Sequence, residues 1–262
     1  MVEPKKYIPQ FIKFPLWYLF KSPQRKINPY SVFYDLFGIF LAGFLSVFKF
    51  YKLKPISICV GIYNRSDLFL KYFIPSLAKA SKQHLIELSV LDCGSNDIED
   101  LENEIKKLYK GKLIYKTIKQ PFSRAFAFNI AVKQSTNSKI FICDADFSIP
   151  ENIVDLVNRF TQFGCIWFPI VFYLYKNKPP EYAKKNGEWM LWGGKGILAC
   201  NKHHFFKVGM LDEKYKQWGF EDEDLWLRFH KQKFVVIRTR CKKLLHHWHK
   251  SLNPKYQALE NK

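Results

Sequence analysis

Acidic residues are scarce in this chain, and their scarcity produces an extreme charge. The 262 residues include 23 Asp or Glu and 42 Lys or Arg, so the formal net charge is +19 at pH 7. Such a surface attracts anions, namely nucleic acid, anionic lipid or a phosphate-bearing substrate. Only charge indicates nucleic acid, because the sequence has no aromatic RNP-type strand, no Cys/His finger spacing and no Lys/Arg block. We therefore expect no nucleic-acid partner.

Cysteine pairs with the close spacing of metal ligands are also missing. Two of the six cysteines, Cys59 and Cys143, lie within apolar runs, where a free thiol behaves as a small hydrophobic side chain. We predict that all six are reduced and lie in or near the core, which is typical of a reducing compartment.

Residues 1–53 form a predicted N-terminal segment that is basic and aromatic. The first 54 residues contain nine Lys or Arg and two acids, Glu3 and Asp35. Residues 30–50 have roughly the length of a membrane span, but Asp35 interrupts them, and Lys surrounds an aromatic patch at residues 11–20. This mixture favours helices that lie in the lipid headgroup region; the alternatives are helices that cap the next domain and a true span. Because no small-residue cleavage site follows a short apolar core, we expect no signal peptide.

Residues 54–262 form a second predicted domain, in which strands and helices alternate. This pattern predicts an α/β fold with a mostly parallel, doubly wound sheet flanked by helices. Ligands of such sheets bind beyond the carboxyl ends of the strands. The expected strands are residues 56–60, 84–91, 113–118, 139–143, 165–175, 197–200 and 234–239, and the expected helices are residues 68–82, 98–109, 124–134, 151–160, 202–208 and 221–231.

Two carboxylates, Asp144 and Asp146, follow the apolar run of residues 139–143. Side chains two apart on a strand point to the same side, so both acids are expected at one lip of the sheet. Converging, partly buried anions need a positive partner, and a divalent cation with oxygen ligands is the natural candidate. For an isolated Asp-x-Asp the alternative is a solvated turn.

Three further features contain groups suited to catalysis or binding. The acids of residues 221–224 either cap a helix or, next to Trp218, grip a sugar through its hydroxyls and C–H edges. His246 and His249 could each supply a metal ligand, whereas the side chain of His247 is expected to point the other way. Arg124 either forms a surface ion pair, or braces a strand end or a diphosphate with its planar fork.

The ordered set of motifs resembles nucleotide-sugar glycosyltransferases of the GT-A fold, namely glycosyltransferase family 2 and its β-1,4-galactosyltransferase-like relatives. The resemblance covers about residues 54–250. It rests on Gly61-Ile-Tyr-Asn-Arg65, Asp92-Cys-Gly-Ser-Asn-Asp97, Pro121-Phe-Ser-Arg-Ala125, Asp144-Ala-Asp146, Trp192-Gly-Gly194, Trp218-Gly-Phe-Glu-Asp222 and the segment from Arg240 to His246.

This resemblance implies a role for each matching residue. Asp222 would be the general base that takes the proton of the acceptor hydroxyl. Asp146 and His246 would bind Mn²⁺ or Mg²⁺, with Asp144 and His249 as weaker candidates. Donor binding would fall to Tyr63, Asn64, Arg65, Asp92, Phe122, Arg124, Asp144 and Ala145, and acceptor binding to Trp192, Gly193, Gly194, Trp218 and Glu221.

Two positions depart from the resembled pattern. Phe220 stands where the galactosyltransferase pattern has Gly, which bears on the identity of the acceptor. Lys243 stands where some relatives use Met as an extra ligand, so the cation would keep more water.

The resemblance implies a metal-dependent, inverting transfer of a galactose-, GalNAc- or glucose-type hexose from a UDP-sugar to a saccharide or lipid-linked glycan. A nuclease or phosphotransferase is the alternative, because clustered carboxylates and positive charge also suit two-metal phosphate chemistry. A third possibility is a basic membrane-surface adaptor whose acids are only helix caps. We expect a cytoplasmic protein attached peripherally to an anionic membrane surface; the alternative is a single-span protein with a lumenal catalytic domain.

Overall fold

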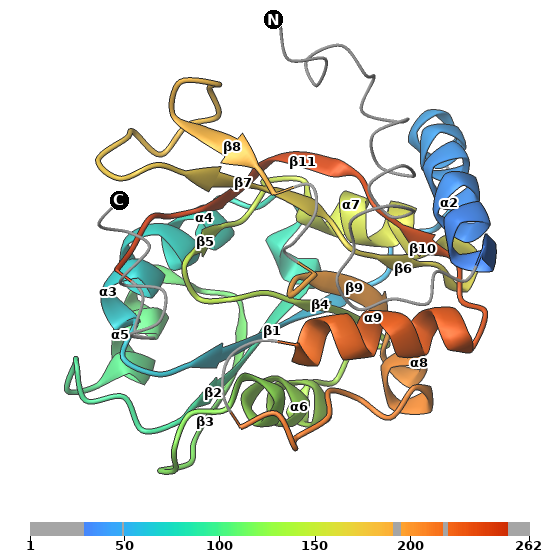
Figure 1. Ribbon diagram of the computed structural model, residues 1–262. Coiled ribbons are helices and arrows are strands. Elements are labelled where there is room, and N and C mark those ends of the chain that lie inside the picture. The colour runs from blue at the N-terminus through green and yellow to red at the C-terminus, as the bar shows by residue number, and fades with distance from the viewer. Residues whose placement is uncertain (1–28, 49, 191–194, 217–219, 251–262) are drawn as a thin grey trace, which may run out of the picture.

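A central seven-stranded sheet organises the computed structural model, which describes residues 29–48, 50–190, 195–216 and 220–250 (Figure 1). The strand order is β10-β6-β9-β4-β1-β2-β3, and β1, β2, β3 and β4 run parallel. A second sheet has the order β5-β11-β7-β8. The strands are β1 (Ile56–Ile62), β2 (Ile86–Asp92), β3 (Lys112–Thr117), β4 (Lys139–Ile142), β5 (Phe147–Ser148), β6 (Ile166–Trp167), β7 (Ile170–Leu174), β8 (Gly187–Trp189), β9 (Leu198–Asn201), β10 (Val236–Ile237) and β11 (Arg240–His246).

Helices cover both faces of the large sheet, as the alternation of strands and helices predicted. One buried cluster joins the sheet to α2, α4, α5 and α7, and a second joins its other face to α6, α8 and α9 (Figure 1). The helices are α2 (Pro29–Val47), α3 (Ser66–Leu68), η2 (Phe69–Phe73), α4 (Ile74–Ala78), η3 (Gln83–Leu85), α5 (Leu101–Leu108), α6 (Arg124–Gln134), α7 (Ile153–Phe160), η4 (Gln162–Gly164), α8 (Lys202–Lys207) and α9 (Glu221–Lys231).

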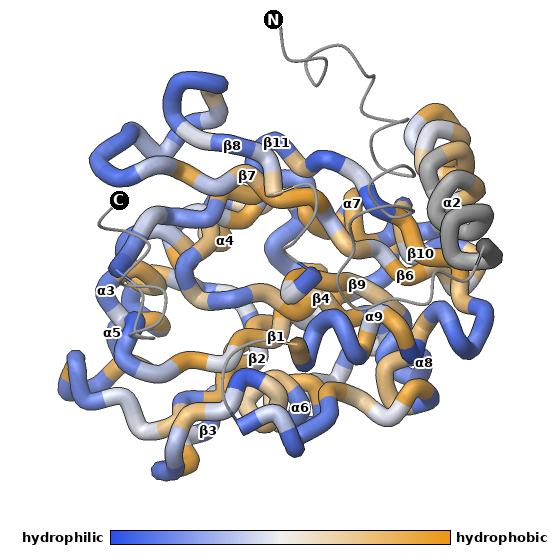
Figure 2. Tube along the Cα trace, in the orientation of Figure 1, coloured by the Kyte–Doolittle hydropathy of each residue, from blue (hydrophilic) through white to orange (hydrophobic). Residues whose placement is uncertain are grey.

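The apolar strands follow from this double covering. In β1 the side chains of Ile58 and Val60 enter one buried cluster, and Cys59 between them enters the other. A strand covered on both faces is mostly apolar, and Figure 2 shows hydrophobic residues in orange along the central strands and hydrophilic residues in blue at the outer turns. All six cysteines are free and buried, as predicted.

The prediction of one aromatic strand over residues 165–175 was wrong. The structure divides it into β6, in the large sheet, and β7, in the second sheet, with Phe168 and Pro169 between them. Proline has no N–H to donate to a ladder, so pairing is interrupted there. Strand β9 also differs from a fully parallel sheet, because it pairs antiparallel with β4. Its chain enters from the carboxyl end of β4, where the Gly196 carbonyl meets Arg124, and therefore runs back along the sheet.

Two predicted helices are shorter in the structure. The helix expected from residue 98 begins at Leu101, after the cap residue Asp100, because the preceding acid Asp97 instead binds the N–H and hydroxyl of Ser66, both at 2.8 Å. The helix expected over residues 68–82 consists of α3, a π-helical turn and α4, with Pro75 in the first turn of α4. Proline has no N–H to donate, and it lies where the pairing changes from the π-helical turn to α4.

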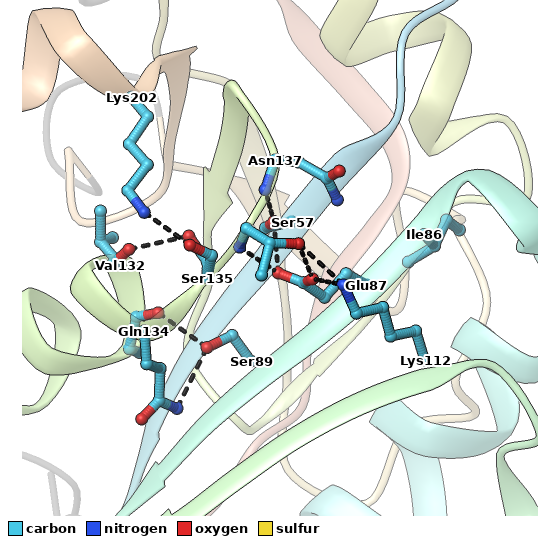
Figure 3. A network of polar contacts seen from close by, with 12 residues as sticks. Ser57, Ile86, Glu87, Ser89, Lys112, Val132, Gln134, Ser135, Asn137 and Lys202 are labelled. Carbon is cyan, nitrogen blue, oxygen red and sulfur yellow. Dashed lines mark hydrogen bonds and ion pairs between the residues drawn. The ribbon is translucent and has the colours of Figure 1, made fainter.

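A polar network at the amino ends of the parallel strands surrounds the buried carboxylate of Glu87 (Figure 3). Glu87 accepts hydrogen bonds from Ser57 Oγ (2.7 Å) and from the N–H and hydroxyl of Thr136, and it pairs with Lys112 Nζ at 2.7 Å. Burial would raise the pKa of Glu87, but the bonds from Lys112 and Thr136 lower it. The network therefore joins β1, β2, β3 and the start of β4 through one ionised group.

Helix α2 packs on the edge strand β10 and on α7, and its residues Ala42 and Leu45 join the core of the domain. At Gly38 an added Cβ would lie 2.2 Å from the Val236 carbonyl oxygen, so glycine permits this close approach. No helix within the described ranges combines the length and the apolar character that crossing a bilayer requires. The aromatic patch predicted at residues 11–20 lies outside the described residues.

Candidate active site

A buried arginine connects three segments at the carboxyl edge of the large sheet. Arg124, the first residue of α6, binds both carboxylate oxygens of Asp144 through Nε (2.8 Å) and Nη2 (3.0 Å). Its Nη1 donates to Glu221 Oε1 at 3.0 Å, and its Nη2 also donates to the Gly196 carbonyl at 2.7 Å. Burial would lower the pKa of Arg124, but Asp144 and Glu221 raise it, so the group stays charged. Of the roles that the sequence allows for Arg124, the structure shows the bracing of a strand end, because the arginine holds Asp144 just after β4.

The two aspartates that follow β4 occupy different environments. Both oxygens of Asp144 are held by Arg124, and burial raises its pKa against the effect of that arginine. Asp146 instead faces two histidines: His249 Nε2 is 2.8 Å and His246 Nε2 is 3.7 Å from Asp146 Oδ2. Burial opposes ionisation of Asp146, but His246 and His249 lower its pKa to about 2.

Asp146, His246 and His249 form a cluster that suits a cation. One ligand atom from each residue lies within 4.8 Å of the others. Within the described ranges Asp146 Oδ1 and His246 Nδ1 are buried and have no hydrogen-bond partner. His249 Nδ1 lies 3.1 Å from the Lys250 carbonyl, which must accept, so His249 Nε2 faces Asp146 with a lone pair unless it gains a proton. A cation bound between Asp146 and His249 Nε2 would give the carboxylate and the imidazole lone pair a partner. The three residues therefore fit a metal ion.

The electrostatics of the histidines agree with this arrangement. Burial lowers the pKa of His246 to about 4, so its imidazole is neutral at pH 7 and able to ligate. Burial also opposes protonation of His249, but the hydrogen bond and the negative charge of Asp146 raise its pKa, because both favour the protonated ring. His247 points elsewhere, as predicted: it contacts Ser148 Oγ at 2.7 Å and stacks on Tyr72. The exposed Lys243 pairs with Glu151 at 3.7 Å.

The loop after β1 presents several predicted donor-binding residues. Tyr63 stacks on Phe122 with ring centroids 6.1 Å apart and an angle of 15° between the planes. Asn64 has a φ of +49° and uses its backbone N–H and side-chain oxygen to bind Ser95 and Asn96. Arg65 donates to the Lys250 carbonyl at 2.9 Å, which brings its charge near Asp146. The small Ala145 is buried between the two aspartates.

Asp92 is buried, and most hydrogen bonds to its carboxylate come from the loop that follows it. Its Oδ1 accepts from the N–H groups of Gly94 (3.0 Å) and Ser95 (2.8 Å) and from Ser95 Oγ, and its Oδ2 accepts from Tyr115 at 2.8 Å. This carboxylate therefore shapes the loop beside Asn64. Its predicted contact with the donor stays a prediction.

The start of α9 places the predicted general base beside the arginine bridge. Glu221 is only 2% exposed and faces Arg124, so its predicted contact with an acceptor stays a prediction. Asp222, the next residue, has a raised pKa, because burial outweighs the effect of Arg124. Phe220, at the cap position, has a φ of +72°, a conformation that glycine adopts more readily. The resembled pattern has Gly there, so Phe220 strains the turn that orients these acids.

Two residues near these acids were missed by the sequence interpretation. Tyr173 stacks on His246 with centroids 4.1 Å apart, and burial, Asp144 and Asp146 raise the pKa of its phenol. Lys195 lies over the Trp226 ring, 4.1 Å from its centroid, and its Nζ is 3.3 Å from Glu223 Oε1. Neither residue belongs to a recognisable motif. Tyr173 reaches the site because β7 pairs with β11, and Lys195 because it packs on Trp226, and the spacing of residues in the sequence reveals neither contact. Trp192, Gly193, Gly194 and Trp218 lie outside the described residues.

Comparisons with known proteins agree on one kind of enzyme. A family model described as chondroitin N-acetylgalactosaminyltransferase matches residues 29–256. Human chondroitin sulfate synthase 3 is 27% identical over 194 residues, which are 66% of this chain and 22% of that protein. Human chondroitin sulfate N-acetylgalactosaminyltransferase 1 is 24% identical over 216 residues, 74% of this chain and 40% of that protein. Human β-1,4-galactosyltransferase 6 is 28% identical over 151 residues, 52% of this chain and 35% of that protein.

The chain thus spans less than half the length of these curated relatives. Among solved structures, S. aureus TarS 1-349 is similar with a TM-score of 0.53 and 15% sequence identity, over 74% of this chain and 60% of that chain. At this identity the similarity concerns the fold alone, and it supports a mixed α/β architecture like that of a GT-A glycosyltransferase.

Proposed function

Because the chain belongs to the chondroitin N-acetylgalactosaminyltransferase family, we propose that it is a metal-dependent, inverting hexosyltransferase. The donor would be a UDP-sugar of the galactose, GalNAc or glucose type, and the acceptor a hydroxyl of a saccharide or lipid-linked glycan. The relatives named chondroitin GalNAc-transferases and galactosyltransferase support hexose transfer.

The Arg124 bridge is the observation that carries this proposal. It binds Asp144, two residues before the candidate ligand Asp146, and also Glu221, the neighbour of the candidate base Asp222. Diphosphate departure and acceptor deprotonation must occur on opposite sides of one sugar carbon. A rigid link between the metal side and the base side is what a single displacement requires.

Asp146, His246 and His249 would hold the cation, which when bound neutralises charge on the departing diphosphate. Two imidazole nitrogens and one carboxylate suit a transition ion better than Mg²⁺, which prefers oxygen ligands, so Mn²⁺ is the better candidate. This choice narrows the earlier expectation of Mn²⁺ or Mg²⁺.

Asp222 would accept the proton of the acceptor hydroxyl at its carboxylate. The hydroxyl oxygen then forms a bond to the anomeric carbon while the bond to the UDP oxygen breaks, and the electron pair leaves with UDP. Burial raises the pKa of Asp222 and makes it a stronger base than an exposed aspartate. One displacement inverts the anomeric centre, and no second carboxylate nucleophile is needed.

The aromatic pair Tyr63 and Phe122 is the proposed platform for the uracil base, because flat rings stack on bases. Asn64 and Arg65 extend the same loop towards the metal cluster. Asp92 would act through the loop that it holds. Family membership favours this enzyme over the nuclease or phosphotransferase and over the adaptor that the sequence also allowed.

A screen of nucleotide sugars by UDP release, with saccharide acceptors, tests the proposal. Wild-type protein should release UDP from at least one UDP-hexose. The Asp222→Asn variant should be slower by roughly 10²–10⁴-fold with little change in donor binding, because the amide cannot take the proton. Equal release by the two proteins in the presence of a competent acceptor would overturn the role of Asp222.

A further inference from the structure

The outer face of α2 and the residues just after this helix carry an apolar patch that no described residue covers. Its members, here called the α2 patch, are Phe37, Phe40, Phe44, Val47, Phe48 and Phe50, and all are exposed. Phe44, Phe48 and Phe50 also contact one another, with ring centroids 4.8 to 5.8 Å apart. Soluble surfaces rarely expose contiguous apolar groups of this kind without a partner.

Helical geometry explains how one helix can have two apolar faces. Residues advance by about 100° each around a helix, so Gly38, Ala42 and Leu45 share one side. That side packs on β10 and the core. The helical members of the α2 patch lie on a separate arc of the same helix, on average roughly 140° away by this count, and Phe48 and Phe50 follow directly after the helix ends at Val47. Helix α2 lies at the edge of the molecule (Figure 1), and the residues of the α2 patch stay exposed when α2 packs on the domain.

The charge around the α2 patch favours an anionic partner. Residues 36–66 contain no Asp or Glu, and the exposed Lys52 and Lys54 follow the patch directly. Phenylalanine rings beside lysines are the composition of helices that lie in the headgroup layer of an anionic bilayer. A second copy of the chain fits poorly, because each copy carries a net charge of +19 and would bring its lysines against like charges.

We propose that the α2 patch docks the folded domain onto an anionic lipid surface, with its phenylalanines among the acyl chains and Lys52 and Lys54 at the headgroups. The attachment then belongs to the domain itself, since α2 is joined to the sheet through β10. An acceptor linked to lipid would meet an enzyme already held at the membrane.

Vesicle sedimentation of the full-length protein tests this proposal. The Phe40→Gln/Phe48→Gln variant removes two patch residues that are 72% and 46% exposed, without changing charge. A matched control, Phe163→Gln/Leu108→Gln, removes two residues elsewhere that are 76% and 46% exposed. Wild type and control should bind vesicles of phosphatidylserine and phosphatidylcholine equally, and the patch variant should bind roughly tenfold or more weakly. Its unchanged unfolding temperature would show that the fold is intact.

Three outcomes would overturn the proposal. Equal binding of wild-type protein to pure phosphatidylcholine vesicles and to the mixed vesicles would rule out the anionic surface as the partner. The two double variants could lose binding equally, which would assign it to general hydrophobicity. A patch variant that binds vesicles like wild type but changes from dimer to monomer by light scattering would assign the face to a second copy.

Discussion

Single residues near the candidate site act through partners that lie far away in the sequence. Arg124 lies 97 positions before its partner Glu221, and it also makes a bidentate contact with Asp144. The sequence interpretation identified Arg124 but left its partner open, because a planar fork suits a carboxylate and a diphosphate equally well. It ranked His249 below His246, whereas in the structure His249 is closer to Asp146. Spacing in the sequence cannot show which of the two histidines lies nearer to Asp146, because strand β11 ends at His246 and His249 lies beyond it.

Lys195 is predicted to lower the pKa of the candidate base Asp222. Asp222 is surrounded by Arg124 of α6, Glu221 and Glu223 of α9, Lys195 before β9 and Tyr173 of β7. Burial raises the pKa of Asp222, and the ammonium of Lys195 partly offsets that rise. In the Lys195→Met variant the pKa of Asp222 should therefore increase. Because the base works only when ionised, the acidic limb of the pH–kcat profile should move to higher pH.

The measurement is a pH profile of UDP release for wild type and Lys195→Met, with Lys202→Met as a control lysine on α8, whose Nζ bonds the Ser135 carbonyl. An unchanged limb in Lys195→Met, with kcat lowered equally at every pH, would give Lys195 a packing role against Trp226 instead.

Helices and strands were predicted best where residues close together in the sequence determine them. The helix over residues 124–134 and the strands around β1 and β4 agree with the sequence interpretation, because apolar runs and turn residues define them. The second sheet was not predicted, since its strands β5, β7, β8 and β11 pair across distances that no local pattern records. The start of α5 was predicted three residues too early for a similar reason: Asp97 accepts a hydrogen bond from Ser66, 31 positions away in the sequence.

The Glu87 network predicts an effect on the parallel strands. In Glu87→Gln the ionised acceptor shared by Ser57, Thr136 and Lys112 becomes a neutral amide that also brings a donor into the buried site. We expect the free energy of unfolding to fall by about 1–3 kcal/mol, measured by urea denaturation. Glu104→Gln is the control, because its ion pair with Lys107 is exposed and should contribute little. Equal stability of the two variants would contradict a structural role for the network.

The positive charge of the whole molecule destabilises its folded state through self-repulsion, and one buried lysine adds to this effect. Lys139, at the start of β4, is buried with its Nζ on Thr161, and burial and the nearby Lys54 lower its pKa to about 8. Between pH 8 and the unfolded-state pKa near 10.5 the unfolded chain binds more protons than the folded one. The buried charge of Lys139 therefore destabilises the fold below pH 8, and this penalty shrinks as the pH rises through that window.

Lys139→Met should remove the buried charge while keeping a long apolar side chain. At pH 7 we expect the variant to be more stable than wild type by about 1–3 kcal/mol, and the difference should shrink as the pH rises towards 10.5. Urea denaturation across this range provides the measurement. A difference that stays constant with pH would show that packing, and not ionisation, separates the two proteins.

The proposed active site combines a cluster of metal ligands at Asp146 with a general base at Asp222. Its most direct test is UDP release by EDTA-treated protein titrated with Mn²⁺, for wild type and Asp146→Asn. The proposed site predicts no release after EDTA, saturable recovery with Mn²⁺ in wild type, and recovery in Asp146→Asn only at roughly tenfold or more higher Mn²⁺, if at all. Full release by wild type in EDTA, or identical Mn²⁺ titrations for the two proteins, would contradict it.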